Sequence, residues 1–246
     1  MELRGRAALV AGGARMGEAL ATRLAARGTA VALAYRSSRE AAERAVGSVR
    51  AAGGSAVALR ADLTNSADVA ALTTAAVDHL GRLDFVVNLA SIYRRTPFDA
   101  LSDEALTDAL EVDLVSAYRL ARAAVPHLRA AGGGRIIHFA DWTAASGRPR
   151  YRGYVPYYVA KRALIGLTEA LALELAPDGI LVNAVAPGPI LPPPDLDASA
   201  AAAVERETPA GRWGGAGAVA DVVIGLLESD FVTGETIRAD GGRHLK

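Results

Sequence analysis

Seven short apolar runs alternate with longer amphipathic segments, and this alternation limits the possible folds more than any other feature of the chain. The runs are Ala7–Ala11, Ala30–Tyr35, Ala56–Arg60, Phe85–Asn88, 135–139, 181–186 and Thr236–Ala239. Most are continuous stretches of Val, Ile, Leu and Ala, which suits strands that are buried on both faces of a sheet. Strands that alternate with helices predict an α/β fold with a parallel, doubly wound sheet.

The segments between these runs are rich in alanine and carry apolar residues at helical spacing. They predict helices over residues 17–27, 39–52, 67–80, 103–129, 156–175 and 219–227. No change in composition marks a boundary, so we predict that residues 1–246 form a single domain. The one long irregular stretch, 187–212, begins with five prolines between Pro187 and Pro194. It is longer than ordinary connections, so a substrate lid is favoured over a loose surface excursion.

The composition argues against several functional classes. The formal net charge is zero, and apart from the short cluster Arg148, Arg150 and Arg152 we find no basic stripe, so nucleic acid is not an expected partner. No apolar run approaches the ~20 residues of a membrane helix, and the first residues do not resemble a secretory signal, so we expect a cytoplasmic protein without membrane contact. The chain has no cysteine and only four scattered histidines, so we expect neither a thiolate nor a metal site.

A glycine-rich turn follows the first predicted strand, in the sequence Gly12-Gly-Ala-Arg-Met-Gly17. Glycine lets the backbone approach a pyrophosphate closely, and the N-terminus of the following helix favours negative charge. In an open α/β sheet, a dinucleotide binds at this position. We therefore predict that Gly12, Arg15, Met16 and Gly17 bind a dinucleotide.

The end of the second predicted strand indicates which dinucleotide is used. An acidic residue at this position would bind a free ribose 2′-hydroxyl, but this chain has Arg36, Ser37 and Ser38. A guanidinium and hydroxyl groups suit a 2′-phosphate. We therefore predict NADPH as the cofactor, the alternative being that Arg36 is a solvated residue at the start of a helix.

Lysine is almost absent from the chain. Of the 27 basic residues, only Lys161 and Lys246 are lysines. Where arginine otherwise supplies positive charge, an interior lysine indicates chemistry that needs a compact, titratable cation. Lys161 stands four residues after Tyr157, so a helix would place both on one face. The ammonium would lower the pKa of the phenol and make Tyr157 a proton donor, the alternative being a chance pair on a solvated helix.

Taken together, these residues resemble the short-chain dehydrogenase/reductase family over essentially the whole chain. The resemblance rests on the 12–17 turn, Asp62-Leu-Thr64, Val87-Asn-Leu-Ala90, Tyr157 with Lys161, Asn183-Ala-Val-Ala-Pro-Gly188, Phe231-Val-Thr-Gly234 and Asp240-Gly-Gly242. Within the family, Tyr35-Arg-Ser-Ser38, Ala140-Asp-Trp142 and Pro187-Gly-Pro-Ile-Leu-Pro192 are similar to the pteridine-reductase-like branch. The resemblance implies a seven-stranded Rossmann sheet, usually in a tetramer, and hydride transfer from a nicotinamide with the tyrosine as the acid.

The resemblance also implies roles for further residues. The remaining residues expected at the cofactor are Asp62, Leu63, Asn88, Ala90, Pro187, Gly188 and Ile190. Lys161 would bind the nicotinamide ribose. Asp141 stands in place of the active-site serine of the family, and Asp113 in place of an asparagine that holds a water next to the lysine. An ionised Asp141 would oppose phenolate formation at Tyr157, and a protonated one would donate a hydrogen bond to the substrate. A helix cap or a loop salt bridge is the other possibility.

Two departures from the family pattern concern lengths. The glycine turn is one residue short, which would reshape the phosphate cradle unless the helix starts one residue earlier. On the first interpretation, a glycine inserted between Arg15 and Met16 would tighten NADPH binding. Asp141 stands 16 residues (157 − 141) before Tyr157, three more than in the pteridine-reductase-like branch. The extra residues lie within 143–153, where Gly147 and Gly153 could absorb them.

We therefore expect an NADPH-dependent reductase of a carbonyl or imine in a pterin-like ring or a small ketone, with Trp142, Tyr93 and Tyr154 in the pocket wall. The alternatives are 3-oxoacyl reduction, NAD(P)-dependent alcohol oxidation, and a non-catalytic, nucleotide-binding regulatory relative. The many small residues in 103–129 and 156–175 predict a homotetramer, or at least a dimer, through these helices.

Overall fold

The computed structural model describes residues 1–193 and 196–246 of the chain. Its seven strands form one sheet in the order β3-β2-β1-β4-β5-β6-β7, and every neighbouring pair is parallel. The strands are β1 (Ala7–Ala11), β2 (Ala30–Tyr35), β3 (Ala56–Arg60), β4 (Phe85–Asn88), β5 (Gly134–Phe139), β6 (Ile180–Pro187) and β7 (Thr236–Ala239). The predicted seven-stranded parallel sheet is confirmed, and each strand lies within one residue of its apolar run.

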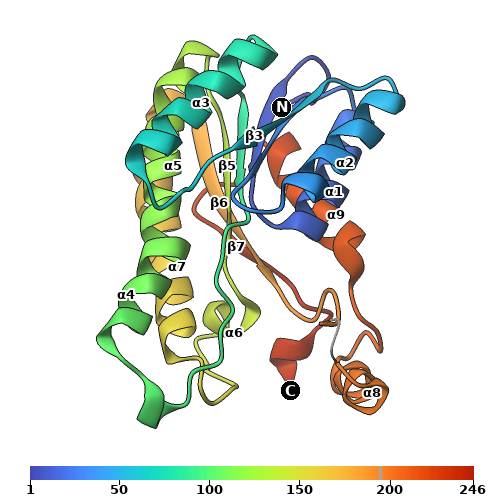
Figure 1. The fold of residues 1–246 in the computed structure, drawn as a ribbon, viewed down its shortest axis with the longest axis vertical. Coiled ribbons are helices and arrows are strands. Elements are labelled where there is room, and N and C mark those ends of the chain that lie inside the picture. Colours follow the sequence, from blue (N-terminus) through green and yellow to red (C-terminus); the bar gives the residue numbers. More distant parts are fainter. Residues whose placement is uncertain (194–195) are drawn as a thin grey trace.

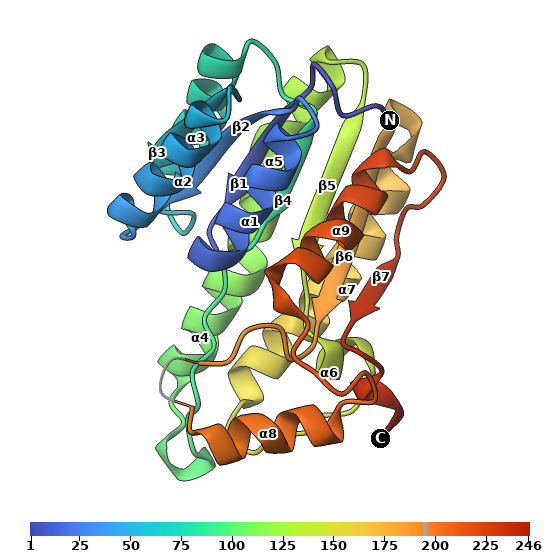
Figure 2. The same cartoon turned by 90° about the vertical axis from the view of Figure 1, so that its right-hand side faces the viewer.

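Helices cover both faces of the sheet (Figure 1). One layer contains α1 (Ala14–Ala25), α2 (Arg39–Ala51) and α9 (Gly215–Glu228), and the other contains α3 (Ser66–Leu80), α5 (Ser116–Ala130) and α7 (Val155–Leu175). Three further helices lie toward the carboxyl ends of the strands: α4 (Asp103–Leu110), α6 (Trp142–Ala145) and α8 (Ala198–Glu207) (Figure 2). The chain is therefore most elaborate at the edge of the sheet where its strands end.

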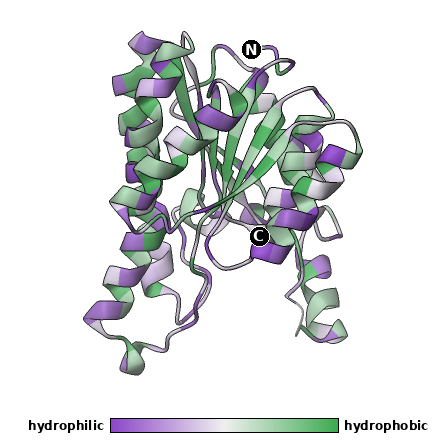
Figure 3. Cartoon of the chain, turned by 45° about the horizontal axis from the view of Figure 1, so that its top comes forward, coloured by the Kyte–Doolittle hydropathy of each residue, from purple (hydrophilic) through white to green (hydrophobic). Residues whose placement is uncertain are grey.

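The core consists of two apolar layers, one on each side of the sheet. Successive strand residues alternate between them: Val10 and Val87 face α1 and α9, whereas Leu9 and Val86 face the layer that contains Leu120 of α5. All five side chains are almost completely buried, and Figure 3 shows the strands as the most hydrophobic part of the fold. Burying one such side chain contributes about 1.5–3 kcal/mol, so the two layers hold the strand ends firmly in place.

Two of the predicted helices differ from the structure. Residues 103–129 were predicted to form one long helix, and they are helical throughout, but the π-helical turn Glu111–Val115 divides the segment into α4 and α5. Such turns insert one residue into a helix and are frequent at functional sites. Helix α1 begins at Ala14, three residues before the predicted start at Gly17, so the last four residues of the predicted glycine turn form the first turn of this helix.

The predicted irregular stretch 187–212 contains a helix. Helix α8 occupies Ala198–Glu207, with the side chain of Asp197 accepting a hydrogen bond from the Ala200 N–H at 2.8 Å. Alanine has the highest helix propensity and aspartate is a favoured N-cap, which explains this helix. Residues 194 and 195 of the predicted lid lie outside the described residues. In the described part of the chain, no helix is long and apolar enough to cross a membrane.

Candidate active site

Two cavities open at the carboxyl ends of the strands. They lie around the point where the chain leaves β1 toward one face of the sheet and leaves β4 toward the other. The first has a volume of about 260 Å³ and is lined by residues that follow β1 to β4. The second has a volume of about 680 Å³ and lies between the start of α7, the segment after β5 and the segment after β6. Gly13 and Leu89 line both cavities. This topological switch point is where open α/β sheets bind their ligands.

The glycine turn brings backbone directly against the first cavity. Gly12 and Gly13 have φ angles of 82° and 65°, a conformation that favours glycine. A Cβ atom on Gly12 would lie 2.9 Å from the Ala90 nitrogen, so no other residue fits this close approach. Because α1 begins at Ala14, the N–H groups of its first turn point toward the turn without partners inside the helix. This end of the helix can therefore receive a phosphate group.

The far end of the first cavity is positively charged. Arg36, Ser37 and Ser38 follow β2 and line it, and Arg36 is exposed. Opposite them, Asp62 accepts hydrogen bonds from the Thr64 N–H at 3.0 Å and from its Oγ1 at 2.8 Å. These bonds, and then the charges of Arg36 and Arg60, lower the pKa of Asp62. Because its carboxylate is held by Thr64, Arg36 remains available for an anionic ligand.

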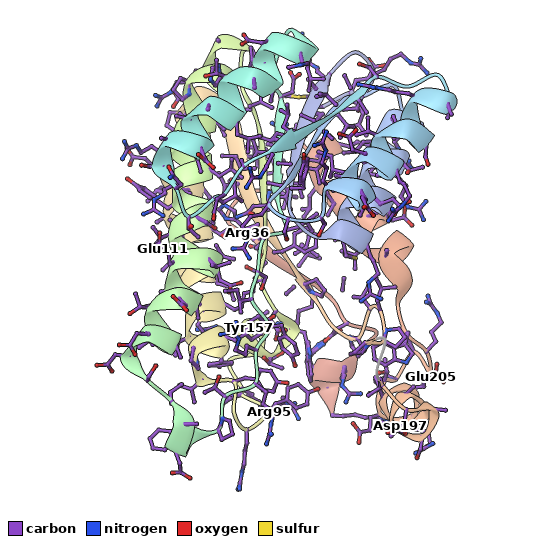
Figure 4. All side chains as sticks on the ribbon, viewed as in Figure 1. Arg36, Arg95, Glu111, Tyr157, Asp197 and Glu205 are labelled. Carbon is purple, nitrogen blue, oxygen red and sulfur yellow. The ribbon has the colours of Figure 1, made fainter. Side chains whose placement is uncertain are left out.

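Tyr157 and Lys161 lie one turn apart on α7 and face the second cavity. Figure 4 shows Tyr157 below the ends of the strands, on the same side of the sheet edge as Arg36. The Tyr157 hydroxyl donates a hydrogen bond to Asp141 Oδ2 at 3.0 Å. The Lys161 ammonium lies 5.7 Å from the centre of the Tyr157 ring. The predicted tyrosine–lysine pair is therefore held in place at the cavity and is not a chance pair on a solvated helix face.

Lys161 is held from two sides. Its Nζ atom donates a hydrogen bond to the Phe139 carbonyl at 2.6 Å and forms an ion pair with Asp113 Oδ1 at 2.9 Å. The side chains of Lys161 and Asp113 are 2% and 0% exposed, respectively. Asp113 belongs to the π-helical turn, and its Oδ2 atom accepts a hydrogen bond from the Ile92 N–H at 3.2 Å. The turn thus brings a buried carboxylate to the position predicted for it, next to the lysine.

Asp141 reaches Tyr157 although three extra residues separate them. It follows β5 and caps α6, where its Oδ1 atom accepts hydrogen bonds from the Thr143 N–H at 2.7 Å and from the Thr143 hydroxyl at 2.5 Å. Gly147 and Gly153, with φ angles of 66° and 87°, let the chain turn back to the start of α7. Asp141 is therefore both a helix cap and a partner of Tyr157, and three donors on its two oxygens are typical of an ionised carboxylate.

The electrostatics of Tyr157 differ from the prediction. Burial raises the pKa of the Tyr157 phenol well above its ordinary value near 10, and the carboxylates of Asp141 and Asp113 raise it further. The expected lowering of this pKa by Lys161 is not the net result in the chain alone, because burial and the two carboxylates together raise it. Tyr157 is therefore protonated at neutral pH, which is the state of a proton donor.

His138 lies on β5, next to the residue whose carbonyl binds Lys161. Its Nδ1 atom is 3.0 Å from the Thr168 hydroxyl, and its side chain is buried. Burial, and secondarily the charge of Lys161, lowers the pKa of His138 to about 4. His138 is therefore a neutral, structural residue near pH 7, as expected for the scattered histidines of this chain.

Aromatic side chains form one wall of the second cavity. The Tyr93 and Tyr154 rings stack with their centres 4.6 Å apart. The Tyr93 and Tyr157 rings are nearly perpendicular, with 4.9 Å between their centres. Trp142 and Tyr151 extend the wall, with 6.3 Å between their centres. The predicted wall residues Trp142, Tyr93 and Tyr154 all line this cavity. A cavity of this shape and lining suits a flat ring or another apolar group.

The lid region and the C-terminus close the opposite side of the second cavity. Ile190, Leu191 and Val204 line it from the predicted lid 187–212, and Trp213 from the position that follows. Arg243, near the C-terminus, donates a hydrogen bond to the Val204 carbonyl at 3.0 Å and pairs with Glu207 at 2.6 Å. Its guanidinium lies 5.7 Å from the centre of the Trp142 ring. Arg243 thus ties α8 to the rest of the site.

The structure brings most of the predicted residues together. Gly12, Arg36, Ser37, Asp62, Leu63 and Ala90 line the first cavity, and Arg15, Met16, Asp141, Tyr157, Lys161, Pro187, Gly188 and Ile190 line the second. Gly17 and Asn88 line neither and shape the turn instead: a Cβ on Gly17 would lie 2.9 Å from the Gly12 oxygen, and Asn88 Oδ1 accepts a hydrogen bond from the Ala90 N–H at 3.0 Å. Asp113 acts behind Lys161 rather than at the cavity surface.

Several lining residues were not predicted. Gly13 lines both cavities, and its place in the glycine turn was a sufficient signal. Tyr151, Trp213 and Arg243 line the second cavity but lie in segments without a recognisable pattern. They meet only because the lid, the segment after α6 and the C-terminus fold onto the same opening.

The chain matches a family model described as enoyl-(acyl carrier protein) reductase over residues 10–244. It is 36% identical to the short-chain reductase protein NovJ of Streptomyces niveus, over 96% of this chain and 93% of that protein. It is 33% identical to a 3-oxoacyl-[acyl-carrier-protein] reductase FabG of Staphylococcus aureus, over 98% of both chains.

A solved structure supports the same grouping. The short-chain dehydrogenase/reductase from Serratia marcescens superimposes with a TM-score of 0.91 at 34% identity, over 99% of this chain and 100% of that one. Members of this family are oxidoreductases that use NAD(P)(H). The fold, the tyrosine–lysine pair and these similarities over nearly the whole length lead to one conclusion: the chain belongs to the short-chain dehydrogenase/reductase family.

Proposed function

We propose that this chain is an NADPH-dependent reductase that adds hydrogen across a carbonyl or imine bond, with Tyr157 as the proton donor. The observation that carries the proposal is the arrangement of Tyr157. Its hydroxyl faces a cavity of about 680 Å³, 3.0 Å from Asp141 and one turn from the buried Lys161. A non-catalytic nucleotide sensor would not need a proton donor held in this way.

The residues of the first cavity fit a phosphorylated dinucleotide. The glycine turn leaves room that any Cβ on Gly12 would fill, and the start of α1 offers free N–H groups next to it. Arg36 and Ser37 would hold a 2′-phosphate, because a guanidinium and a hydroxyl supply several donors to its oxygens. The absence of an acidic residue after β2 supports NADPH over NADH.

The chemistry of the proposed reaction is divided between cofactor and protein. NADPH, when bound, supplies the hydride to the carbonyl or imine carbon. Tyr157 transfers its proton to the substrate oxygen or nitrogen, so that the double bond takes up one hydride and one proton in total. Asp141 fixes the direction of the Tyr157 hydroxyl, and Lys161 stabilises the phenolate that forms.

A flat ring is the substrate that the walls of the second cavity suit best. Tyr93, Tyr154 and Trp142 present broad aromatic surfaces, and Asp141 is an acceptor for a ring N–H at the base of the cavity. This combination supports a pterin-like ring, or a small aryl ketone, and a place in the pteridine-reductase-like branch of the family.

A second candidate is the reduction of a 3-oxoacyl group, which the name of the Staphylococcus aureus relative mentions. One feature of the structure favours it. Five exposed arginines lie in two segments that contribute lining residues to the second cavity, and Arg150 itself lines it. The Thr96 N–H donates a hydrogen bond to the Gly153 carbonyl at 2.7 Å and joins the two segments. The arginines are Arg94, Arg95, Arg148, Arg150 and Arg152. Their positive charge would suit an acyl chain delivered on an anionic carrier.

Both candidates can be separated by following NADPH consumption with a dihydropterin, an aryl ketone and an acyl thioester. We expect turnover of the ring substrates that changes little with salt. If the acyl thioester is preferred, and its kcat/KM falls steeply as salt is added, these arginines recruit an anionic carrier and the second candidate replaces the first. If no compound of either class is reduced, the proposed function is wrong.

We also propose that the chain forms a homotetramer, or at least a dimer, through residues 103–129 and 156–175. The helices α4, α5 and α7 expose large apolar side chains, among them Leu106, Tyr118, Val159 and Leu173. Covering them would remove apolar surface from water. Light scattering at micromolar concentration should give the mass of an oligomer, and a monomeric mass would contradict this proposal.

A further inference from the structure

The catalytic pair is surrounded by an unusual set of charges. Asp113 contacts Lys161 from the π-helical turn, and Asp141 contacts Tyr157 from the end of β5. Lys161 is the one cation in direct contact with either carboxylate in the described part of the chain. Tyr157 therefore lies beside two negative charges and one positive charge.

The other titratable groups around Tyr157 and Lys161 do not change this balance of charge. Tyr93, Tyr154 and Tyr151 face the pair from the loop after β4 and the segment before α7. Burial raises the pKa of Tyr93, so it adds no charge near pH 7. His138 approaches from β5 and is neutral, with a pKa of about 4. Arg150 and Arg243 line the same cavity, with their guanidinium groups 5.7 Å from the centre of the Trp142 ring, and neither pairs with Asp113 or Asp141 in the described part of the chain. Asp113 thus decides whether the site has a net negative charge.

We propose that Asp113 is a positioning residue which, by pairing with Lys161, keeps Tyr157 in its proton-donating state far into the alkaline range and so adapts the site to reduction. The inference rests on the proposed function of Tyr157 as the acid. Reduction needs the Tyr157 O–H, which gives its proton to the substrate while a hydride from NADPH adds to carbon. Alcohol oxidation needs the phenolate, which takes the hydroxyl proton while the hydride leaves carbon for NADP⁺. Asp113 does not alter the overall equilibrium. It sets the pH range in which each direction runs.

The geometry explains why a carboxylate and an amide would differ at this position. An asparagine could still accept the hydrogen bond from the Ile92 N–H, which lies 3.2 Å from Asp113 Oδ2. It could not neutralise the ammonium of Lys161 at 2.9 Å. The full charge of the Lys161 ammonium, which lies 5.7 Å from the centre of the Tyr157 ring, would then act on Tyr157 and favour the phenolate.

The test is Asp113→Asn, examined first without cofactor or substrate. The ionisation of Tyr157 is followed by the ultraviolet absorbance of phenolate against pH, with Tyr157→Phe in each background subtracted to isolate this residue. A charge at such a distance shifts a pKa by about 1–3 units, so we expect the Tyr157 titration to move down by at least about one pH unit. In the active enzyme, the alkaline limit of kcat/KM for reduction should move by the same amount, and so should the acid limit for alcohol oxidation.

Two variants serve as controls. Asp108→Asn removes the same charge from an exposed position on α4 and should shift nothing. Asp113→Glu retains the negative charge next to Lys161, so its Tyr157 titration should stay nearer to the wild-type curve than that of Asp113→Asn, whatever the longer side chain does to turnover. If Asp113→Asn leaves the Tyr157 titration unchanged while lowering thermal stability, Asp113 is only structural and the proposal is overturned.

If Asp113→Asn does not fold, the wild-type titration still decides the matter. A Tyr157 that ionises at or below the pH of the exposed tyrosines would contradict the proposal. Because these titrations need no substrate, their failure can be distinguished from the failure of the proposed function, which would appear as a lack of turnover with a normal titration.

Discussion

The first cavity takes most of its walls from residues at or just after the ends of β1 to β4, whereas the second also takes walls from the segment after α6, the segment after β6 and the residues near the C-terminus. Gly12, Arg36 and Asp62 each stand one or two residues after a strand. Around Tyr157, by contrast, Tyr93, Trp213 and Arg243 come from three separate segments. The first cavity, the proposed nucleotide end, is therefore recognisable from short local patterns, and the second, the proposed catalytic end, depends more on tertiary folding.

The charged groups of the two cavities also differ in their exposure to solvent. Arg36 is exposed at the first cavity, where water screens it. Lys161 and Asp113 are almost fully buried, so a change to either acts at full strength on its neighbours. We therefore expect substitutions near Tyr157 to have larger effects than substitutions near Arg36, and the following predictions test this order.

The largest effect should come from the acid itself. Tyr157→Phe should lower kcat by about two to four orders of magnitude, because it removes the proton donor while leaving the ring in place. NADPH binding should barely change. Lys161→Arg should be nearly as damaging, since the guanidinium cannot replace a compact ammonium between Phe139 and Asp113. Steady-state kinetics with the best substrate provide the measurement.

Tyr154→Phe is the matched control for this experiment. Tyr154 stacks on Tyr93 and lines the same cavity, but Asp141 bonds the hydroxyl of Tyr157. The control should keep most of the activity. The opposite result, with Tyr154→Phe inactive and Tyr157→Phe active, would transfer the role of acid to Tyr154.

Much of the fold and of the candidate site was predictable from the sequence, and the two cavities show why. Continuous apolar runs predicted the seven strands, because buried parallel strands need such runs. The glycine turn and Arg36 were recognisable because each follows a strand at a fixed distance. Tyr157 and Lys161 were recognisable because one helical turn separates them.

The remaining features of the site depend on contacts between residues that are far apart in the sequence, and sequence patterns do not indicate such contacts. The π-helical turn lies within an ordinary amphipathic segment, yet it brings Asp113 to Lys161. The raised pKa of Tyr157 depends on two carboxylates that meet only in the fold. Arg243 lies at the far end of the chain and reaches the site through α8. Such contacts require the tertiary structure.

The next effect concerns stability at the catalytic end. His138 has a pKa of about 4 in the folded chain, against 6.5 when unperturbed. Between these values the unfolded chain binds a proton that the native chain does not, so stability is lost as the pH falls from 6.5 toward 4. We expect His138 to account for about 3 kcal/mol of this loss. Urea unfolding at several pH values measures it: His138→Asn should flatten the slope, whereas the exposed His79→Asn should not.

At the nucleotide end, Arg36→Asp should weaken NADPH binding. Losing a charge-assisted hydrogen bond to a phosphate costs about 1.5–3 kcal/mol, which is about 10- to 150-fold in affinity. NADH binding should change little, because NADH has no 2′-phosphate. Fluorescence titration with both nucleotides measures the effect, and Arg44→Asp on the exposed face of α2 is the control. Tighter binding of NADH than NADPH by the wild-type chain would refute the cofactor assignment.

The smallest effect concerns the short glycine turn. From sequence, a glycine inserted between Arg15 and Met16 is predicted to tighten NADPH binding by restoring a missing backbone donor. The structure favours the other interpretation, because α1 already begins at Ala14 and Gly13 caps it in the left-handed conformation. An insertion would fall inside the first turn of α1 and displace its N–H groups from the cavity. We therefore expect the dissociation constant to stay within about tenfold of the wild-type value, on the weaker side.

A glycine inserted after Gly53, in the turn between α2 and β3, controls for the general effect of lengthening the chain, because a Cβ there would meet no other atom. Both variants should bind NADPH measurably, and the control should match the wild type. Tighter binding by the first variant alone would show that the turn is truly deficient. In that case the nucleotide end, although locally specified, would be the region in which this chain has lost affinity, and the contrast between the two cavities would be reversed.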